Sequence, residues 1–201
     1  MSYSKDIFRQ LGRPEGEVGR KVLSRLNEVN ATINQFTLEA IGRDPSEKVL
    51  EIGFGGGALM AAALQQFGST AFVGVDVSPL AVEEATEKFA SRIAEGRAEF
   101  HLLEDDALPF GDRVFGTVIS VNVVYFVADL ARQTREVFRV LRPGGRYTVS
   151  YSERSPDEVT RFPPSKIETL LGEAGFDDVS SRTSSDEEHD TFHCTVGVRP
   201  A

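Results

Sequence analysis

The chain has 201 residues, of which 40% are hydrophobic and 26% charged, and this composition suits one globular domain with a substantial core. Its 22 basic and 31 acidic residues give a net charge of −9, which disfavours nucleic acid and anionic membrane surfaces as partners. A single cysteine, Cys194, excludes an intrachain disulfide framework, and we expect a soluble cytoplasmic protein without a signal sequence or a membrane span.

The N-terminal part is expected to be irregular at first and then helical. Residues 1–18 are rich in glycine and proline, which interrupt regular structure. Apolar residues from Val22 to Phe36 then recur every three or four positions, which predicts one face of a helix. Because Asp44-Pro45 ends this pattern, we assign residues 1–45 to a helical cap and residues 46–201 to the main domain.

Short apolar runs alternate with helical stretches through the rest of the chain. The predicted strands are 48–52, 71–75, 99–103, 117–121, 146–151, 178–182 and 192–198. The predicted helices are 58–67, a segment beginning at Ser78-Pro79, 130–141 and 165–174. Strands that alternate with helices favour an α/β fold with a parallel sheet covered on both faces. The acidic run 184–190 is interpreted as a solvated loop between the last two strands.

A glycine-rich segment, Glu51-Ile52-Gly53-Phe54-Gly55-Gly56-Gly57-Ala58, joins the first of these strands to a helix. Glycine lets the backbone approach a ligand, and the helix start directs free N–H groups toward it. Asp76 ends the next strand, where a carboxylate can accept hydrogen bonds from ribose hydroxyls. These features predict a nucleoside cofactor but also fit the dinucleotide pattern G-x-G-x-x-[GA], so they leave the cofactor open.

After the third strand, Glu104-Asp105-Asp106-Ala107 places carboxylates and N–H groups where they could read an adenine edge. With this segment, the sequence resembles the class I S-adenosylmethionine-dependent methyltransferases, in a small-molecule branch similar to methyltransferase type 11. The matching segments are Val49–Gly57, Val73–Pro79, Asp106–Phe110, Val137–Gly145 and Ala174–Phe176.

The resemblance covers residues 46–199 and implies both a fold and a cofactor. The fold is Rossmann-like, with a seven-stranded, mostly parallel sheet, helices on both faces and a reversed C-terminal β-hairpin. The cofactor is S-adenosyl-L-methionine, with S-adenosyl-L-homocysteine as product. The implied cofactor-binding residues are Glu51, Gly53, Phe54, Gly55, Gly57, Asp76, Val77, Ser78, Asp105, Asp106, Ala107 and Asn122.

The acceptor is less well indicated than the cofactor. Some amino-methylating relatives carry Asn-Pro-Pro-Tyr where this chain has Asn122-Val123-Val124-Tyr125. Because both prolines are missing, the resemblance does not indicate a nitrogen acceptor. Asn122 and Tyr125 are the candidate catalytic residues, with a role in positioning rather than as acid or base. The N-terminal segment commonly lies over the cofactor in this family. Residues expected to close the site are Tyr3, Phe8, Arg9 and Arg13.

Methyl transfer to an unidentified, small-molecule acceptor is the leading hypothesis. One alternative is a nicotinamide-dependent oxidoreductase, although no tyrosine is followed four residues later by the lysine that a short-chain enzyme needs. The other is a non-catalytic, cofactor-binding member of the same fold. The histidines show no metal-ligand spacing, so we expect no metal.

Overall fold

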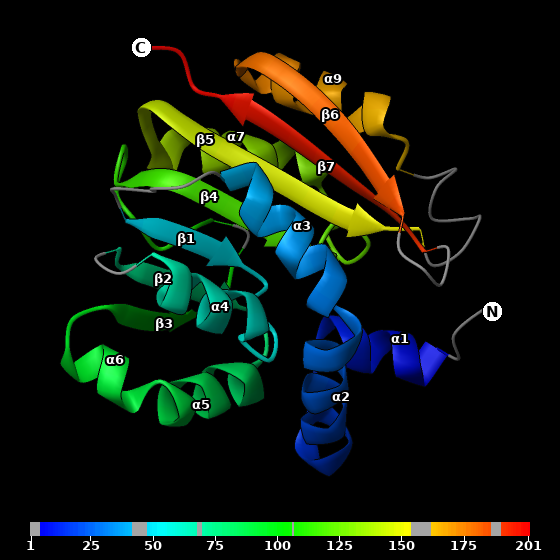
Figure 1. Cartoon of the computed structure of the whole chain (residues 1–201), viewed down its shortest axis with the longest axis vertical. Coiled ribbons are helices and arrows are strands. Elements are labelled where there is room, and N and C mark those ends of the chain that lie inside the picture. The colour runs from blue at the N-terminus through cyan, green and yellow to red at the C-terminus, as the bar shows by residue number, and fades with distance from the viewer. Residues whose placement is uncertain (1–4, 42–47, 68–69, 106, 154–161, 186–189) are drawn as a thin grey trace.

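The computed structural model describes residues 5–41, 48–67, 70–105, 107–153, 162–185 and 190–201. Seven strands form one sheet in the order β3-β2-β1-β4-β5-β7-β6, with helices on both faces (Figure 1). The strands are β1 (Val49–Ile52), β2 (Phe72–Asp76), β3 (Ala98–Leu102), β4 (Phe115–Val121), β5 (Leu141–Ser152), β6 (Asp177–Ser185) and β7 (Thr191–Val198).

Strand direction follows the predicted pattern. Strands β1 to β5 pair in parallel, whereas β7 is antiparallel to β5 and β6 is antiparallel to β7. The α/β fold and the reversed C-terminal hairpin are therefore confirmed. In a sheet of this order the chain reverses its direction of winding between β1 and β4, so the carboxyl ends of these strands border a crevice.

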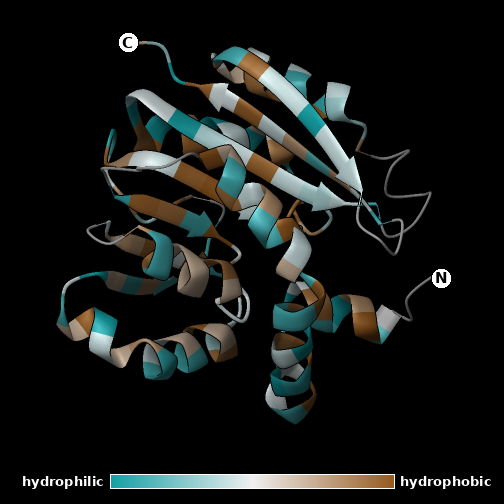
Figure 2. Ribbon diagram, viewed as in Figure 1, coloured by the Kyte–Doolittle hydropathy of each residue, from teal (hydrophilic) through white to brown (hydrophobic). Residues whose placement is uncertain are grey.

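Two apolar layers hold the helices to the sheet. Helices α3 (Ala31–Ile41), α4 (Ala58–Gln66) and α5 (Pro79–Lys88) lie on one face, and α7 (Leu130–Val140) and α9 (Pro164–Ala174) lie on the other. The first layer includes Leu38, Leu59 and Ile119, and the second includes Val118 and Val137. Strand β1 is buried along its whole length and β4 along nearly all of it, and both are mostly hydrophobic in Figure 2.

The N-terminal part corrects our expectation of irregular structure. Helix α1 (Lys5–Gly12) and helix α2 (Gly16–Val29) occupy most of residues 1–18. Glycine and proline mark the boundaries of these helices and do not interrupt them, since Pro14 lies in the short connection between them. The expected single helix from Val22 to Phe36 is divided at Asn30 into α2 and α3.

Other differences are small. The helix that begins at Pro79 breaks at Phe89 into α5 and the short α6 (Ala90–Ala94). The expected domain boundary between residues 45 and 46, and most of the acidic run 184–190, lie outside the described residues. Among the helices that are described, none combines the length and apolar character needed to cross a lipid bilayer.

Candidate functional site

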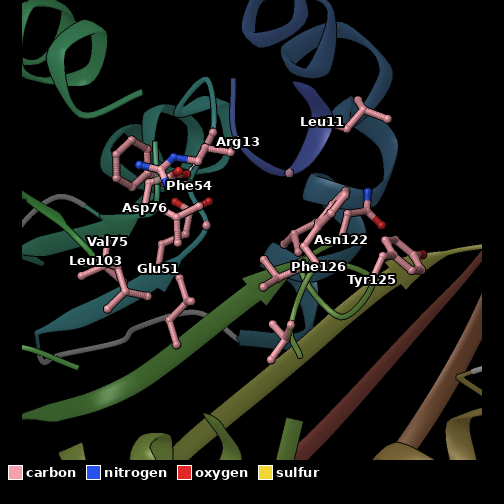
Figure 3. Close-up of a pocket in the computed structure, with 18 of the residues that line it drawn as sticks. Leu11, Arg13, Glu51, Phe54, Val75, Asp76, Leu103, Asn122, Tyr125 and Phe126 are labelled. Carbon is pink, nitrogen blue, oxygen red and sulfur yellow. Dashed lines mark hydrogen bonds between the residues drawn. The ribbon is translucent and has the colours of Figure 1, made fainter. Parts of the chain in front are cut away.

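A pocket of about 640 Å³ lies at the carboxyl edge of the sheet, under the N-terminal helices (Figure 3). Its floor consists of the glycine loop after β1, the end of β2 and the segment after β4. Helices α1 and α2 and the start of α3 complete it on the other side. The pocket therefore occupies the crevice where ligands bind in open α/β sheets.

The glycine loop has a backbone conformation that residues other than glycine rarely adopt. Gly53 and Gly55 have φ angles of 68° and 52°, in the left-handed region that favours glycine. A Cβ atom on Gly53 would lie 2.6 Å from Cγ2 of Val123, whereas one on Gly55 would meet nothing within 4 Å. Because Gly55 lines the pocket, its open side leaves room for a ligand against the backbone.

Asp76 fixes this loop from the end of β2. Its carboxylate accepts hydrogen bonds from the Gly55 N–H at 3.0 Å and the Ser78 N–H at 2.9 Å. The side chain is only 6% exposed, and its burial raises the pKa of Asp76 although these N–H groups act in the opposite direction. Each carboxylate oxygen can accept more than one hydrogen bond, so Asp76 can also bind a ligand hydroxyl.

Glu51 is a second buried carboxyl group in the pocket wall (Figure 3). The residue is 3% exposed, and in the described part of the chain its Oε2 has no hydrogen-bond partner. Burial and, to a smaller extent, the charge of Asp76 raise the pKa of Glu51 to about 8. A buried polar atom without a partner is costly to the protein, so this oxygen is suited to a donor or a cation of a bound ligand.

Asn122 and Tyr125 hold the segment after β4 in place. Asn122 has a φ angle of 56°. Its Oδ1 accepts from the Ser152 N–H at 2.9 Å, and its Nδ2 donates to Oδ1 of Asn30 at 3.2 Å. The Tyr125 hydroxyl donates to the Ser152 carbonyl. Both side chains line the pocket while being anchored to β5, so the geometry suits positioning better than proton transfer.

The N-terminal helices close the pocket through contacts with two separate parts of the site. The Phe8 ring lies 5.0 Å from that of Phe126, centroid to centroid. The Ser78 hydroxyl donates to the carbonyl of Pro14 at 2.7 Å. Phe8, Arg9 and Arg13, expected to close the site, all line the pocket. Tyr3, the fourth, lies outside the described residues.

Most of the predicted cofactor residues come together in the pocket. Those that line it are Glu51, Gly53, Phe54, Gly55, Asp76, Val77, Asp105 and Asn122. Three do not: Gly57 is buried beside Phe89, Ser78 is buried and caps α5, and Ala107 is exposed. Asp106, the predicted reader of the adenine edge, lies outside the described residues.

The sequence analysis missed a polar stripe on the helical side of the pocket. Asn27 of α2, Asn30 between the two helices and Asn34 of α3 are three and four residues apart in the sequence, and all three line the pocket. Their spacing within an otherwise apolar helical pattern was the available signal. Within the described residues, no group of three or more acidic, histidine or cysteine side chains could hold a metal ion.

Comparisons with known proteins agree on one type of domain. Residues 49–145 match a family model described as a methyltransferase domain. An arsenite methyltransferase of Halobacterium salinarum is 36% identical over 141 residues, covering 68% of this chain but only 36% of that protein. An uncharacterized methyltransferase of Bacillus subtilis, YdaC, is 29% identical over 156 residues, covering 75% of this chain and 82% of that one.

A solved structure shows the same fold. Haemonchus contortus phosphoethanolamine N-methyltransferase 2, solved in complex with S-adenosyl-L-methionine, superimposes with a TM-score of 0.77 at 15% identity. The superposition covers all of this chain and 61% of that one. At this identity the likeness concerns the fold, including the extra helices that precede β1.

Proposed function

The chain belongs to the class I S-adenosylmethionine-dependent methyltransferases, and we propose that it methylates a small molecule bound beneath the N-terminal helices. The combination of Gly55, Asp76 and Glu51 in one pocket supports the proposal. The open side of Gly55 admits a ligand against the backbone, Asp76 can accept from ribose hydroxyls, and the unpartnered Oε2 of Glu51 suits the cofactor's amino group.

The proposed reaction needs a general base only if the acceptor must lose a proton. When bound, S-adenosylmethionine supplies a methyl group on a positively charged sulfur, and the acceptor's lone pair displaces that sulfur in line. Asn122 and Tyr125 fix the wall where acceptor and methyl group meet. The N-terminal helices exclude water from this point and align the acceptor. We propose that residues 1–45 act together as this cap.

Arsenite is a poor candidate for the acceptor even though a relative carries that name. Soft metal ions and metalloids are bound by thiolates, and the only cysteine of the chain is Cys194. Its side chain is fully buried in β7 and does not line the pocket. Burial also raises the pKa of the Cys194 thiol, which keeps it protonated.

Calorimetric titration tests the cofactor directly. We expect saturable binding of S-adenosylmethionine and S-adenosylhomocysteine at one site per chain, and no binding of reduced nicotinamide adenine dinucleotide. Incorporation of labelled methyl groups into extracts of small molecules then tests turnover. Binding of the nicotinamide in place of the two sulfur compounds would refute the proposal, and cofactor binding with no turnover on any extract would favour the non-catalytic alternative.

A matched pair of glycine substitutions distinguishes the effect of backbone strain on stability from a direct effect on cofactor binding. Gly55 and Gly96 both have positive φ angles, of 52° and 69°, and a Cβ on either meets nothing within 4 Å. Gly55→Ala and Gly96→Ala should therefore each cost about 1–2 kcal/mol of stability, measured by urea unfolding. Only Gly55→Ala should also weaken S-adenosylhomocysteine binding, by about tenfold or more, because its methyl group enters the pocket. Equal binding by the two variants would show that the loop does not contact the cofactor.

A further inference from the structure

Asn34 is a buried polar residue of the pocket with no assigned partner. It lies on α3, is 8% exposed and lines the pocket. Its backbone N–H belongs to the helix, bonding to the Asn30 carbonyl at 2.9 Å. In the described part of the chain, however, no hydrogen bond involves its carboxamide. The carboxamide is not among the fully enclosed polar atoms that lack a partner, so it is accessible from the pocket, where a ligand can take the place of water as its hydrogen-bond partner.

The place of Asn34 in the fold points to the acceptor side of the pocket. It lies one helical turn beyond Asn30, whose Oδ1 accepts from Asn122. Helix α3 packs over β4, β5 and β7 and against α4, whereas Asp76 ends β2, on the far side of β1 from β4. Asn34 thus lies one helical turn from the hydrogen bond between Asn30 and Asn122 at the end of β4, and the proposed ribose contact is at the end of a different strand.

The surrounding wall is mainly apolar and aromatic. The lining contributed by the N-terminal helices and the segment after β4 includes Phe8, Leu11, Leu26, Val123, Tyr125 and Phe126. Arg9 and Arg13 share a single salt-bridge partner, Glu15, and the described lining contains more acidic than basic residues. The described lining contains no lysine or histidine. Such a wall favours an uncharged molecule over a phosphorylated or carboxylated one.

We propose that Asn34 is a specificity-determining residue that hydrogen-bonds a hydroxyl or amino group of a neutral, largely apolar acceptor. The proposal rests on the proposed function and adds the class of acceptor to it. Asparagine offers both a donor and an acceptor, so it can recognise either group. A site built to bond such a group discriminates against a molecule of the same shape that lacks it.

The test uses two small probes of nearly equal shape, 4-methylphenol and 1,4-dimethylbenzene, which differ by one hydroxyl group. Each is titrated calorimetrically into the complex of the protein with S-adenosylhomocysteine. Asn34→Leu keeps the size of the side chain and removes its polar atoms. We expect this variant to bind 4-methylphenol about tenfold more weakly than the wild type, to bind 1,4-dimethylbenzene equally or better, and to keep its affinity for S-adenosylhomocysteine within twofold.

The control is Gln35→Leu, the same kind of change at the next residue, whose exposed side chain pairs with Glu39 at 3.3 Å. It should leave all three affinities unchanged. Melting temperatures check folding, and Asn34→Ala replaces Asn34→Leu if the latter does not fold.

Several results would overturn the inference. One is an equal loss of affinity for both probes in Asn34→Leu. Another is a loss of affinity for S-adenosylhomocysteine, which would assign Asn34 to the cofactor. Tighter wild-type binding of 4-methylbenzoate or 4-methylbenzylamine than of 4-methylphenol would show a charged acceptor, and binding of none of these probes would likewise reject it. Failure of the wild type to bind S-adenosylhomocysteine is a separate result, which would overturn the proposed function itself.

Discussion

Glu51→Gln is expected to weaken cofactor binding by about 1.5–3 kcal/mol at pH 7.5, the range for hydrogen bonds to charged groups. It should also remove the pH dependence of that binding. Because burial raises the pKa of Glu51 to about 8, the carboxyl group of the free protein is mostly protonated at neutral pH. Binding an ammonium group beside it must then release a proton.

The sign and the pH range of this effect follow from the two titrating groups. Wild-type affinity should rise with pH, by up to about tenfold per unit, while Glu51 of the free protein is protonated. The rise should level off near pH 8, where Glu51 ionises in the free protein, and the affinity should fall at higher pH as the ligand ammonium group loses its proton. Titrations in phosphate and in Tris, which differ in ionisation enthalpy, measure the proton released. Glu28→Gln, on an exposed residue paired with Arg25, is the control and should behave as the wild type does.

The same substitution should make the protein without cofactor more stable at alkaline pH. A carboxyl group whose folded-state pKa is raised stabilises the protein below its unfolded pKa of about 4.5, and this contribution is lost as the pH rises through about 8. Glu51→Gln should therefore exceed the wild type in free energy of unfolding by about 2–4 kcal/mol at pH 8. Near pH 5 the difference should be small. Urea unfolding at both pH values measures it, and an equal difference at each pH would contradict the assignment.

Asp76→Ala is expected to weaken S-adenosylhomocysteine binding by about 1–3 kcal/mol, or 5- to 150-fold. Two effects contribute, because Asp76 both faces the pocket and accepts from the Gly55 N–H at 3.0 Å. Adenosine and 2′,3′-dideoxyadenosine separate them. Loss of the ribose contact weakens the binding of adenosine only, whereas a displaced glycine loop weakens the binding of both nucleosides.

The expected result is a larger loss for adenosine than for its dideoxy analogue. Asp112→Ala, which removes an exposed carboxylate paired with Arg139, should leave both nucleosides unaffected. If Asp76→Ala reduces both nucleosides by the same factor, the ribose assignment is wrong and Asp76 serves the loop alone.

The sheet and the glycine loop could be predicted because their signals are local. The strands of the parallel sheet are short apolar runs, since both faces are covered, and the loop glycines lie between β1 and α4 in the sequence itself. The single seven-stranded sheet and the reversed hairpin were implied by the family resemblance, because pairing between β5 and β7 is not encoded in either strand alone.

The helical side of the site was harder to predict. Helix α1 has only eight residues, and breakers at its end conceal its amphipathic pattern. Asn30 and Asn34 line the pocket only because of the way α3 crosses β4, and periodicity along the chain does not reveal that crossing. Asn122 was identified through its place after β4, but its hydrogen bond to Asn30 became visible only in three dimensions.

The hydroxyl of Ser78 has a consequence for how new selectivities could arise. This hydroxyl accepts from the Ala81 N–H at the start of α5 and donates to the Pro14 carbonyl, so it joins the N-terminal segment to the main domain at a fixed point. Residues before Pro14 can then change in sequence while these two hydrogen bonds remain. Chimaeras that exchange the residues before Pro14 between homologues should therefore change the substrate preference and leave the cofactor-binding part of the pocket intact.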